Sequence, residues 1–468
     1  MNRKYLLLIC MICSLSTSAQ SVAPQLDTLL RNTLDSMRTL LNNKSLSAAI
    51  QIDANTSWSY ATGVSEENPN VYVTPDHVYE IGSVTKTMTA GAILKLVDQG
   101  ILNLDDSIHQ WLPPMNFVDS NITIRQLLRH QSGLYDVLAN PSNQPTLLND
   151  MNKIWTPQEL IDTFLMAPLA APGGTWNYCN TNYFLLAMII KAATGQEYHQ
   201  LIRSNFFTSL QLNDIAIPAF ETLSSNVAHV WIDLNGDNIV DDAHNLYFNW
   251  LSLNSTAGAA GGYYATAKDV SKWMRAYMRG DFHSPVVMQE AKSTITAPGL
   301  PGGTYGLGLM KKTFLGLDGY GHGGDLSYSS SSWYFPSKDI SISVLNNDSR
   351  KISWDLISTV TALLKTYNNW LILTAVNTST LIESGLKIFP SPCSNNLHLR
   401  FVANKGILTR LLIINAFGQL VQSQSIVLKE GVNQIDVQTA NLPNGYYTIH
   451  IQDEHQWIQD KFVVQHLN

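Results

Sequence analysis

Apolar residues recur at helical spacing in four stretches of the chain. Residues 26–41 and 88–97 carry apolar positions every three to four residues, which predicts helices with one buried face. Residues 183–193 are apolar enough for a fully buried helix, and residues 354–367 predict a further helix.

Short stretches rich in apolar residues predict strands on both sides of the helical block. Residues 48–52 and 58–62 form one pair, and residues 332–335 and 340–345 form another. Strand blocks that enclose a helical block are typical of a sheet flanked by helices. The sequence therefore predicts an α+β domain over residues 20–370.

The character of the chain changes after this domain. A stretch rich in Thr, Ser and Asn at residues 371–385 predicts a linker, and apolar and polar residues then alternate at 397–401 and 435–437. Several short alternating strands with turn residues between them are typical of a sandwich. We therefore expect a small β-sandwich over residues 386–468.

Residues 1–19 have the pattern of a signal peptide. Arg3 and Lys4 precede an apolar stretch at residues 5–13, and small residues end at Ala19. We expect cleavage after Ala19 and export from the cytoplasm. No other apolar run has the length of a membrane span, so no transmembrane segment is expected.

Composition narrows the classes of function. The 468 residues include 29 basic and 36 acidic residues, a net charge of −7 without a basic run, which argues against a nucleic-acid partner. Beyond the predicted signal peptide only Cys179 and Cys393 remain, too few for a disulfide scaffold. A hydrophobic content of 45% is ample for a large core.

The first candidate for chemistry is the pair Ser83 and Lys86. Residues i and i+3 of a helix share one face, so this S-x-x-K pair sets a hydroxyl beside an amine. Near a helix N-terminus, unpaired N–H groups favour developing negative charge. The pattern alone is weak evidence, because it recurs at residues 384–387.

Two further short motifs follow in order. Residues 178–180 read Tyr-Cys-Asn, and residues 322–324 read His-Gly-Gly. Y-x-N recurs at Tyr247 and Tyr367, whereas H-x-G occurs once. The specific signal is the order S-x-x-K, Y-x-N, H-x-G with wide gaps between the motifs.

This ordered set, together with residues 127–134 and 260–269, resembles the serine β-lactamase and penicillin-binding superfamily. The likeness is greatest to its class C-like branch, which includes D-alanyl-D-alanine carboxypeptidases and related esterases. It covers roughly residues 26–364. The resemblance implies a β-lactamase/transpeptidase-like antiparallel sheet flanked by helices.

The resemblance also implies a role for each motif residue. Ser83 is the acylated nucleophile, Lys86 and Tyr178 share the proton transfers, and Asn180 orients the substrate. His322 stands where many relatives carry the lysine of a K-T-G strand.

The chemistry sets its own requirements. A serine hydroxyl needs a base, and a lysine serves only if burial or nearby positive charge lowers its pKa; a phenol serves when it is stabilised as phenolate. The resemblance places the oxyanion-hole donors at the N–H groups of Ser83 and Asp325. Gly323 and Gly324 would let a substrate lie close to the strand.

Structural explanations exist for the same residues. Ser83 could cap a helix with Lys86 in solvent, Tyr178 could be an ordinary half-buried tyrosine, and His322 could belong to a turn. The ordered context favours the catalytic interpretation.

We therefore predict an exported serine hydrolase that acts on an amide or ester through an acyl-enzyme, without a cofactor. Relatives often place hydroxyl residues at the third motif to bind a substrate carboxylate, but here Gly323 and Asp325 occupy those positions. An acidic side chain facing the site would repel a carboxylate. Two alternatives remain: a D-alanyl-D-alanine carboxypeptidase or β-lactamase acting on peptidoglycan peptides or β-lactams, and a non-enzymatic penicillin-recognising sensor or surface binding protein.

The tail resembles a second known family. Residues 386–397, 415–421 and 442–447 are similar to the C-terminal sorting domain of the type IX secretion system, although residues 390–392 read Pro-Ser-Pro where relatives usually have Pro-Asn-Pro. The resemblance implies the type IX machinery as a partner and a secreted or cell-surface location, with the periplasm as the alternative. A carbohydrate-binding or spacer sandwich is the other interpretation.

Residues 233–242 place oxygen ligands at several positions of an EF-hand-like loop. Asn238 replaces the turn glycine and His244 replaces the bidentate acid, so a solvated acidic loop is the favoured interpretation and calcium binding stays open. The chain has no H-E-x-x-H and no G-x-S-x-G, which disfavours a zinc hydrolase and an α/β-hydrolase. We predict no metal site.

Overall fold

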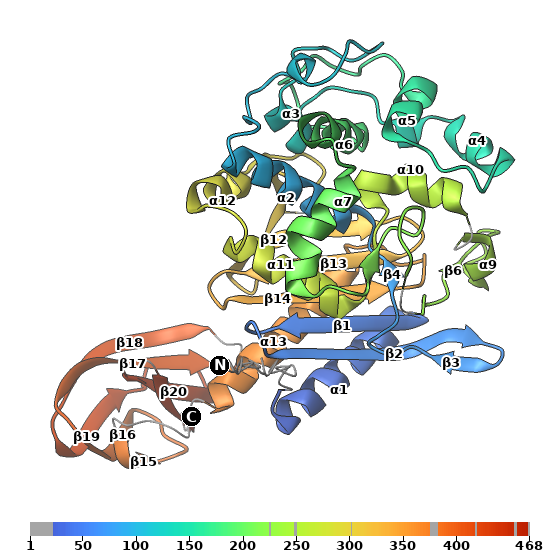
Figure 1. Cartoon of the computed structure of the whole chain (residues 1–468). Coiled ribbons are helices and arrows are strands. Elements are labelled where there is room, and N and C mark those ends of the chain that lie inside the picture. The colour runs from blue at the N-terminus through green and yellow to red at the C-terminus, as the bar shows by residue number, and fades with distance from the viewer. Residues whose placement is uncertain are drawn as a thin grey trace, which may run out of the picture. The chain divides into compact units, whose positions relative to one another are not determined.

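The structure is a computed structural model that describes residues 22–466 except 224–225, 248–249, 301, 375–381, 417–418 and 454–455. The predicted signal peptide, residues 1–19, lies outside the described residues. The chain forms two compact units, Met1–Lys365 and Thr366–Asn468 (Figure 1).

A nine-stranded antiparallel sheet forms the framework of the first unit. Its order is β3-β2-β1-β14-β13-β12-β11-β10-β9, so strands from the two ends of the unit pair at its centre, with Ala48 opposite Val344. Both predicted strand pairs are confirmed in this one sheet. The strands are β1 (Ser45–Gln51), β2 (Ser57–Glu67), β3 (Asn70–Tyr72), β9 (Ile295–Thr296), β10 (Thr304–Tyr305), β11 (Met310–Phe314), β12 (Leu317–Asp325), β13 (Ser329–Phe335) and β14 (Ile340–Asn346).

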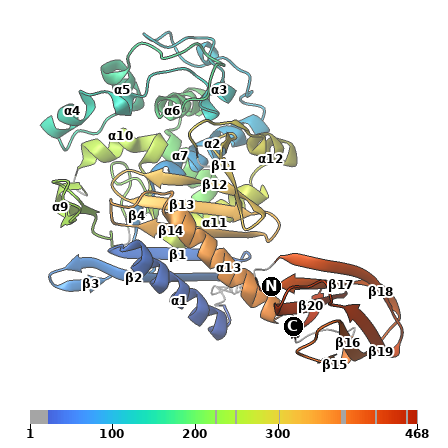
Figure 2. The same ribbon diagram turned by 180° about the vertical axis from the view of Figure 1, so that it is seen from behind.

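Helices cover both faces of this sheet. Every residue of β1, β13 and β14 is buried, as expected for strands with a helix on each side. Helix α11 (Ala267–Arg279) packs on β1, β13 and β14, and α1 (Pro24–Leu41) packs on β1 and β2. Figure 2 shows α1 and the first turns of α13 (Leu356–Thr374) across the face opposite α11. The helices predicted at residues 26–41 and 354–367 are confirmed.

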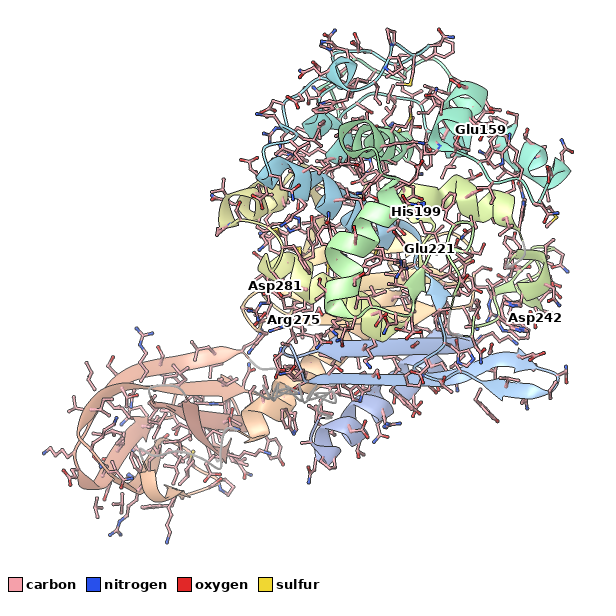
Figure 3. All side chains as sticks on the ribbon, viewed as in Figure 1. Glu159, His199, Glu221, Asp242, Arg275 and Asp281 are labelled. Atoms are coloured by element: carbon pink, nitrogen blue, oxygen red, sulfur yellow. The ribbon has the colours of Figure 1, made fainter. Side chains whose placement is uncertain are left out.

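An ion pair fixes α11 to the turn between β13 and β14. Arg275, labelled in Figure 3, donates from its guanidinium to the Asp339 carboxylate at 2.6 Å and from Nε to the Asp339 carbonyl at 2.7 Å. The Arg275 side chain is only 6% exposed, so its charge needs these partners.

A block of helices lies beside the sheet and carries much of the core. Helix α2 is buried along most of its length and packs against α6, α7 and α10, which confirms the helices predicted at residues 88–97 and 183–193. The helices of this part are α2 (Thr85–Asp98), α3 (Ile124–Leu128), α4 (Asn143–Asn149), α5 (Pro157–Phe164), α6 (Thr181–Thr194), α7 (Tyr198–Ile202), α8 (Thr208–Leu210), α9 (His244–Tyr247), α10 (Leu251–Gly261) and α12 (Pro285–Lys292).

Two small sheets complete the first unit. One has the order β4-β8-β5 (Tyr79–Glu80, Tyr264–Ala265 and Ile215–Ala216), and the other pairs β6 (Trp231–Ile232) with β7 (Asp241–Asp242). The acidic loop connects β6 to β7, and the Asp233 carboxylate accepts backbone N–H groups of Gly236, Asp237 and Asn238. Among the described residues, no group of three or more His, Cys, Asp or Glu is placed to hold a metal ion.

The second unit contains two antiparallel sheets of the orders β15-β16-β19 and β18-β17-β20-β21. Leu397, Leu399 and Phe401 of β16 and Val437 of β19 share one core with residues of the other sheet, which confirms the predicted sandwich. The strands are β15 (Ile382–Phe389), β16 (Asn396–Ala403), β17 (Ile407–Asn415), β18 (Leu420–Leu428), β19 (Gly431–Gln438), β20 (Gly445–Asp453) and β21 (Gln456–Val464).

In the part of the chain that the structure describes, no helix combines the length and the apolar character that a membrane span requires.

Candidate active site

Ser83 lies in a tight turn between a strand and a buried helix. β4 leads into a 3₁₀ turn, Gly82–Val84, and α2 begins at Thr85. The turn is fixed from both sides: the Ile81 N–H donates to the Tyr263 carbonyl at 2.9 Å, and the Ile81 carbonyl accepts the Ser330 hydroxyl at 2.6 Å. The half-buried Ser83 side chain therefore has a rigid base.

Strand β12 approaches this turn backbone to backbone. Gly82 has φ 49°, and a Cβ there would lie 2.8 Å from the Asp325 nitrogen. A Cβ on Gly324 would lie 2.0 Å from the Ile81 carbonyl oxygen and 2.9 Å from the Ser83 nitrogen. Only glycine allows this contact, and the contact brings the two expected oxyanion-hole amides, those of Ser83 and Asp325, to adjacent segments.

Lys86 is fully buried and makes three short contacts through Nζ. Its partners are Ser83 Oγ at 2.9 Å, Asn180 Oδ1 at 2.7 Å and the Ala260 carbonyl at 2.8 Å. Burial lowers the pKa of Lys86 to about 7, although the charges of Asp136 and Cys179 oppose the shift. A neutral amine donates to the two carbonyl oxygens and turns its lone pair to the Ser83 hydroxyl, which is the arrangement of a general base.

Tyr178 lies next to this pair as an uncharged phenol. Lys86 Nζ lies 4.9 Å from the centre of the Tyr178 ring. Burial raises the pKa of Tyr178 well above its usual value, and a side-chain hydrogen bond with Ser83 lowers it only in part. The sequence left a phenolate base open; a buried, uncharged phenol is instead suited to donating a proton.

Asn180 connects Lys86 to a carboxylate. Its Oδ1 accepts from Lys86, while its Nδ2 and its backbone N–H donate to Asp136 Oδ2 at 2.8 and 3.1 Å. Asp136 therefore fixes which end of the Asn180 amide faces Lys86. The predicted substrate-orienting role of Asn180 stays a prediction, because both ends of this amide have partners within the protein.

His322 is fully buried on β12. Its Nε2 lies 2.9 Å from the Tyr305 hydroxyl and its Nδ1 lies 2.5 Å from the Gly323 carbonyl. Burial, reinforced by the charge of Lys86, lowers the pKa of His322 to about 3. His322 is therefore an uncharged ring with both nitrogens engaged within the protein.

Asp325 lies at the end of β12 and is held by Ser353. The carboxylate accepts the Ser353 N–H and hydroxyl, both at 2.6 Å. Although Asp325 is an exposed residue, partial desolvation of its carboxylate raises the pKa of Asp325, against these hydrogen bonds. A Cβ on Gly323 would lie 2.7 Å from Ser353 Oγ, so Ser353 closely covers this strand.

These residues enclose a cavity of about 270 Å³. Six of the eight predicted site residues line it; Lys86 is buried beneath it, in contact with Ser83 Oγ, and Gly324 lies against the Ser83 turn. The cavity lining consists of Gly82, Ser83, Leu138, Tyr178, Asn180, Ala257, Ala260, Gly261, Leu300, Met310, His322, Gly323, Asp325, Leu326, Ser353 and Trp354. A larger open cavity of about 780 Å³ between Arg38 and Arg350 contains none of the three motifs.

Sequence reasoning missed four contributors to this site: Asp136, His130, Tyr305 and the Ala260 carbonyl. His130 and Ala260 fall in residues 127–134 and 260–269, two stretches that carry the family resemblance but to whose residues the sequence assigned no role. Asp136 and Tyr305 carried no signal of their own.

The likeness to known proteins can now be stated. Residues 34–354 match the family described as Beta-lactamase. The chain belongs to the β-lactamase family. Residues 387–465 match the family described as Secretion system C-terminal sorting domain, so the tail is a sorting domain.

Within the β-lactamase family, penicillin-binding proteins and amidases are similar to this chain. Penicillin-binding protein 4* of Bacillus subtilis (strain 168) is 33% identical over 168 residues, covering 34% of this chain and 34% of that protein. The chain thus matches about a third of the length of this relative.

Two solved structures resemble this β-lactamase family member more widely. The D-stereospecific amidohydrolase from Streptomyces sp. is 28% identical, with a TM-score of 0.62, over 70% of this chain and 97% of that one. The D-amino acid amidase from Ochrobactrum anthropi SV3, solved with L-phenylalanine amide, is 25% identical, with a TM-score of 0.65, over 74% and 99%. Both neighbours are amide hydrolases by name and share the fold of the first unit.

Proposed function

We propose that the chain is a serine hydrolase that acylates Ser83 with the acyl group of an amide or ester and then transfers this group to water. The observation that carries the proposal is the contact of 2.9 Å between Lys86 Nζ and Ser83 Oγ, made by a fully buried lysine. A lysine whose pKa is near 7 is partly neutral at physiological pH, so it can take the serine proton.

In the proposed acylation, Lys86 accepts the Ser83 proton while Oγ attacks the substrate carbonyl carbon. The negative charge passes to the carbonyl oxygen, next to the N–H groups of Ser83 and Asp325. When the bond to the leaving group breaks, the Tyr178 phenol gives its proton to that group and regains one from Lys86. Deacylation repeats the steps with water as the nucleophile.

The charges of the cavity favour substrates without a carboxylate. No Arg or Lys occurs among the described residues that line it, His322 is uncharged, and Asp325 adds a carboxylate. A neutral or amine-bearing amide or ester fits this environment better than an anion does. The similarity to two amidases supports this choice; the similarity to a penicillin-binding protein supports a second candidate, a D-alanyl-D-alanine peptide or β-lactam.

Asp325→Asn tests the substrate class, because it removes the charge and keeps the shape. Acylation by a penicillin should improve about fivefold relative to a neutral ester, which corresponds to about 1 kcal/mol of screened repulsion. The ratio of the two acylation rates is the measurement. Asp355→Asn, which removes a nearby carboxylate outside the cavity lining, should leave the ratio unchanged; an equal ratio in both variants would refute the preference for uncharged substrates.

We further propose that the sorting domain brings the enzyme to the outside of the cell through the type IX machinery. The sandwich has its own core, so its removal should spare the first unit. A variant that lacks residues 386–468 should keep its activity in vitro but be lost from the surface and medium of the native host. Equal amounts of both forms outside the cell would instead make the tail a binding or spacer domain.

A further inference from the structure

Three buried side chains form a continuous hydrogen-bonded chain behind the catalytic residues. His130 Nε2 lies 3.2 Å from the Tyr305 hydroxyl, and the same hydroxyl lies 2.9 Å from His322 Nε2. All three side chains have no exposed surface. They come from distant parts of the sequence, and only His322 belongs to a catalytic motif.

At the His130 end of this hydrogen-bonded chain, two donors fix which ring nitrogen of His130 carries the proton. The backbone N–H of Cys179 points at His130 Nδ1 over 3.1 Å, and a backbone amide can only donate. The Asn182 side chain adds a second donor at 3.3 Å, oriented by the Ser132 hydroxyl, which donates to Asn182 Oδ1 at 2.6 Å. Since Nδ1 of His130 must accept, the neutral ring carries its proton on Nε2 and donates it to Tyr305.

The other end independently fixes the proton on His322. A carbonyl oxygen can only accept, so the contact to the Gly323 carbonyl requires a proton on His322 Nδ1. Nε2 of His322 then accepts, and the Tyr305 hydroxyl donates to it. The Tyr183 hydroxyl donates to the Leu128 carbonyl at 3.4 Å, so toward Tyr305 its oxygen can only accept; the imidazole Nε2 of His322, a stronger acceptor than a phenol oxygen, takes the single Tyr305 proton over 2.9 Å. The two ends therefore agree on the direction of hydrogen-bond donation, which runs from the Cys179 N–H through His130, Tyr305 and His322 to the Gly323 carbonyl.

The surroundings keep both imidazoles uncharged. Burial and the nearby charge of Lys86 lower the pKa of His130 well below its usual value and that of His322 to about 3. A second proton on His130 would sit on Nδ1 and face the Cys179 N–H. A second proton on His322 would sit on Nε2 and face the donating Tyr305 hydroxyl.

We propose that His130 and Tyr305 are positioning residues that hold His322 as an uncharged ring with both nitrogens occupied inside the protein. The third motif then offers the substrate neither a cation nor an N–H donor, although relatives carry a lysine at this position. A substrate carboxylate therefore finds no partner on His322. The consequence for selectivity rests on the proposed function, whereas the protonation pattern does not.

The same rings also contact the catalytic phenol. The His130 ring packs on the Tyr178 ring with a centroid distance of 4.2 Å, and the His322 ring lies 6.3 Å from Tyr178. One network thus orients the proposed proton donor and the third motif together.

The first test measures protonation on the wild-type, full-length protein with ¹⁵N-labelled histidine. Long-range ¹H–¹⁵N couplings distinguish the two neutral tautomers and the cation, and His130→Gln and His322→Gln serve only for assignment. We expect His130 with its proton on Nε2 and His322 with its proton on Nδ1, both unchanged from pH 8 to pH 5. A cationic His322, or a proton on its Nε2, would overturn the proposal whether or not the enzyme turns over any substrate.

The second test interrupts the hydrogen-bonded chain by the substitution Tyr305→Phe. His322 Nε2 then loses its donor while Nδ1 keeps its bond to the Gly323 carbonyl, so the neutral ring should keep its proton on Nδ1, and a bound carboxylate can draw a second proton onto the free Nε2. The rate ratio of a carboxylate-bearing ester to its neutral analogue should rise about fivefold, the effect of one hydrogen bond.

Tyr334→Phe is the matched control, because Tyr334 is a buried tyrosine whose hydroxyl bonds Asp339 at 3.0 Å, apart from this network. It should leave both the tautomer and the ratio unchanged. An unchanged ratio in Tyr305→Phe, or an equal loss of activity toward both esters, would overturn the selectivity role. If the wild-type enzyme hydrolyses neither ester, the proposed function fails. The histidine spectra still show whether His130 and His322 carry their protons as the hydrogen-bonded chain requires.

Discussion

Ser83→Ala is expected to reduce turnover of a chromogenic ester by about 10⁴-fold or more, because loss of a serine nucleophile removes the acyl-enzyme route. The fold should persist. The Ser83 hydroxyl does not cap its turn, and its partners are the side chains of Lys86 and Tyr178. Losing these hydrogen bonds costs about 1 kcal/mol each, which a domain of this size tolerates.

Steady-state kinetics of the purified variant, with thermal unfolding as a check of the fold, gives the result. Ser332→Ala is the matched control, since Ser332 is a buried serine on β13 that bonds Ser343 at 2.7 Å and does not line the cavity. It should retain wild-type turnover. A Ser83→Ala enzyme with near wild-type turnover would remove the basis for acylation at this position.

Lys86→Ala and Tyr178→Phe should each reduce kcat by about 10³-fold or more, and the double variant should lose little beyond the more damaging single change. Residues that act as one unit in proton transfer give strongly non-additive losses. Because only the neutral form of Lys86 can accept the serine proton and its pKa is about 7, wild-type kcat/KM should rise with pH through that value. The acidic limb should disappear in Lys86→Ala.

The control for the lysine is Lys95→Ala on the same helix, where the ammonium donates to the Phe282 carbonyl at 2.8 Å, away from the cavity. It should keep the wild-type pH profile. Losses in kcat that simply add in the Lys86 and Tyr178 double variant would mean independent roles for the two residues and would require another base.

The parts of the site that sequence could predict are those set by local spacing. Ser83 and Lys86 lie within one turn of backbone, so a helix beginning here necessarily brings the hydroxyl to the amine, and the structure has this contact at 2.9 Å. Apolar periodicity likewise located α1, because a single buried face determines it, and a nearly continuous apolar stretch located α6, which is buried on almost all sides. The sandwich followed from strand alternation in the same way.

The remaining parts depend on contacts between distant segments. The pairing of β1 with β14 is set by sheet order, which local patterns do not specify. The meeting of His130, Tyr305 and His322 depends on three elements that pack only in the folded unit. No spacing in the sequence links His130 or Tyr305 to the H-x-G motif, so their residue types carried no signal. The charge state of His322 follows from burial, which the H-x-G motif alone does not encode.

The central claim is that Ser83 carries the acyl group. Incubating the wild-type, full-length enzyme with a fluorophosphonate or a slowly hydrolysed activated ester, followed by intact mass measurement and peptide mapping, tests it most directly. We predict one adduct per chain, located on Ser83, formed faster as the pH rises through 7 and absent in Ser83→Ala. An adduct on another residue, or an active preparation that forms none on Ser83, would contradict the account.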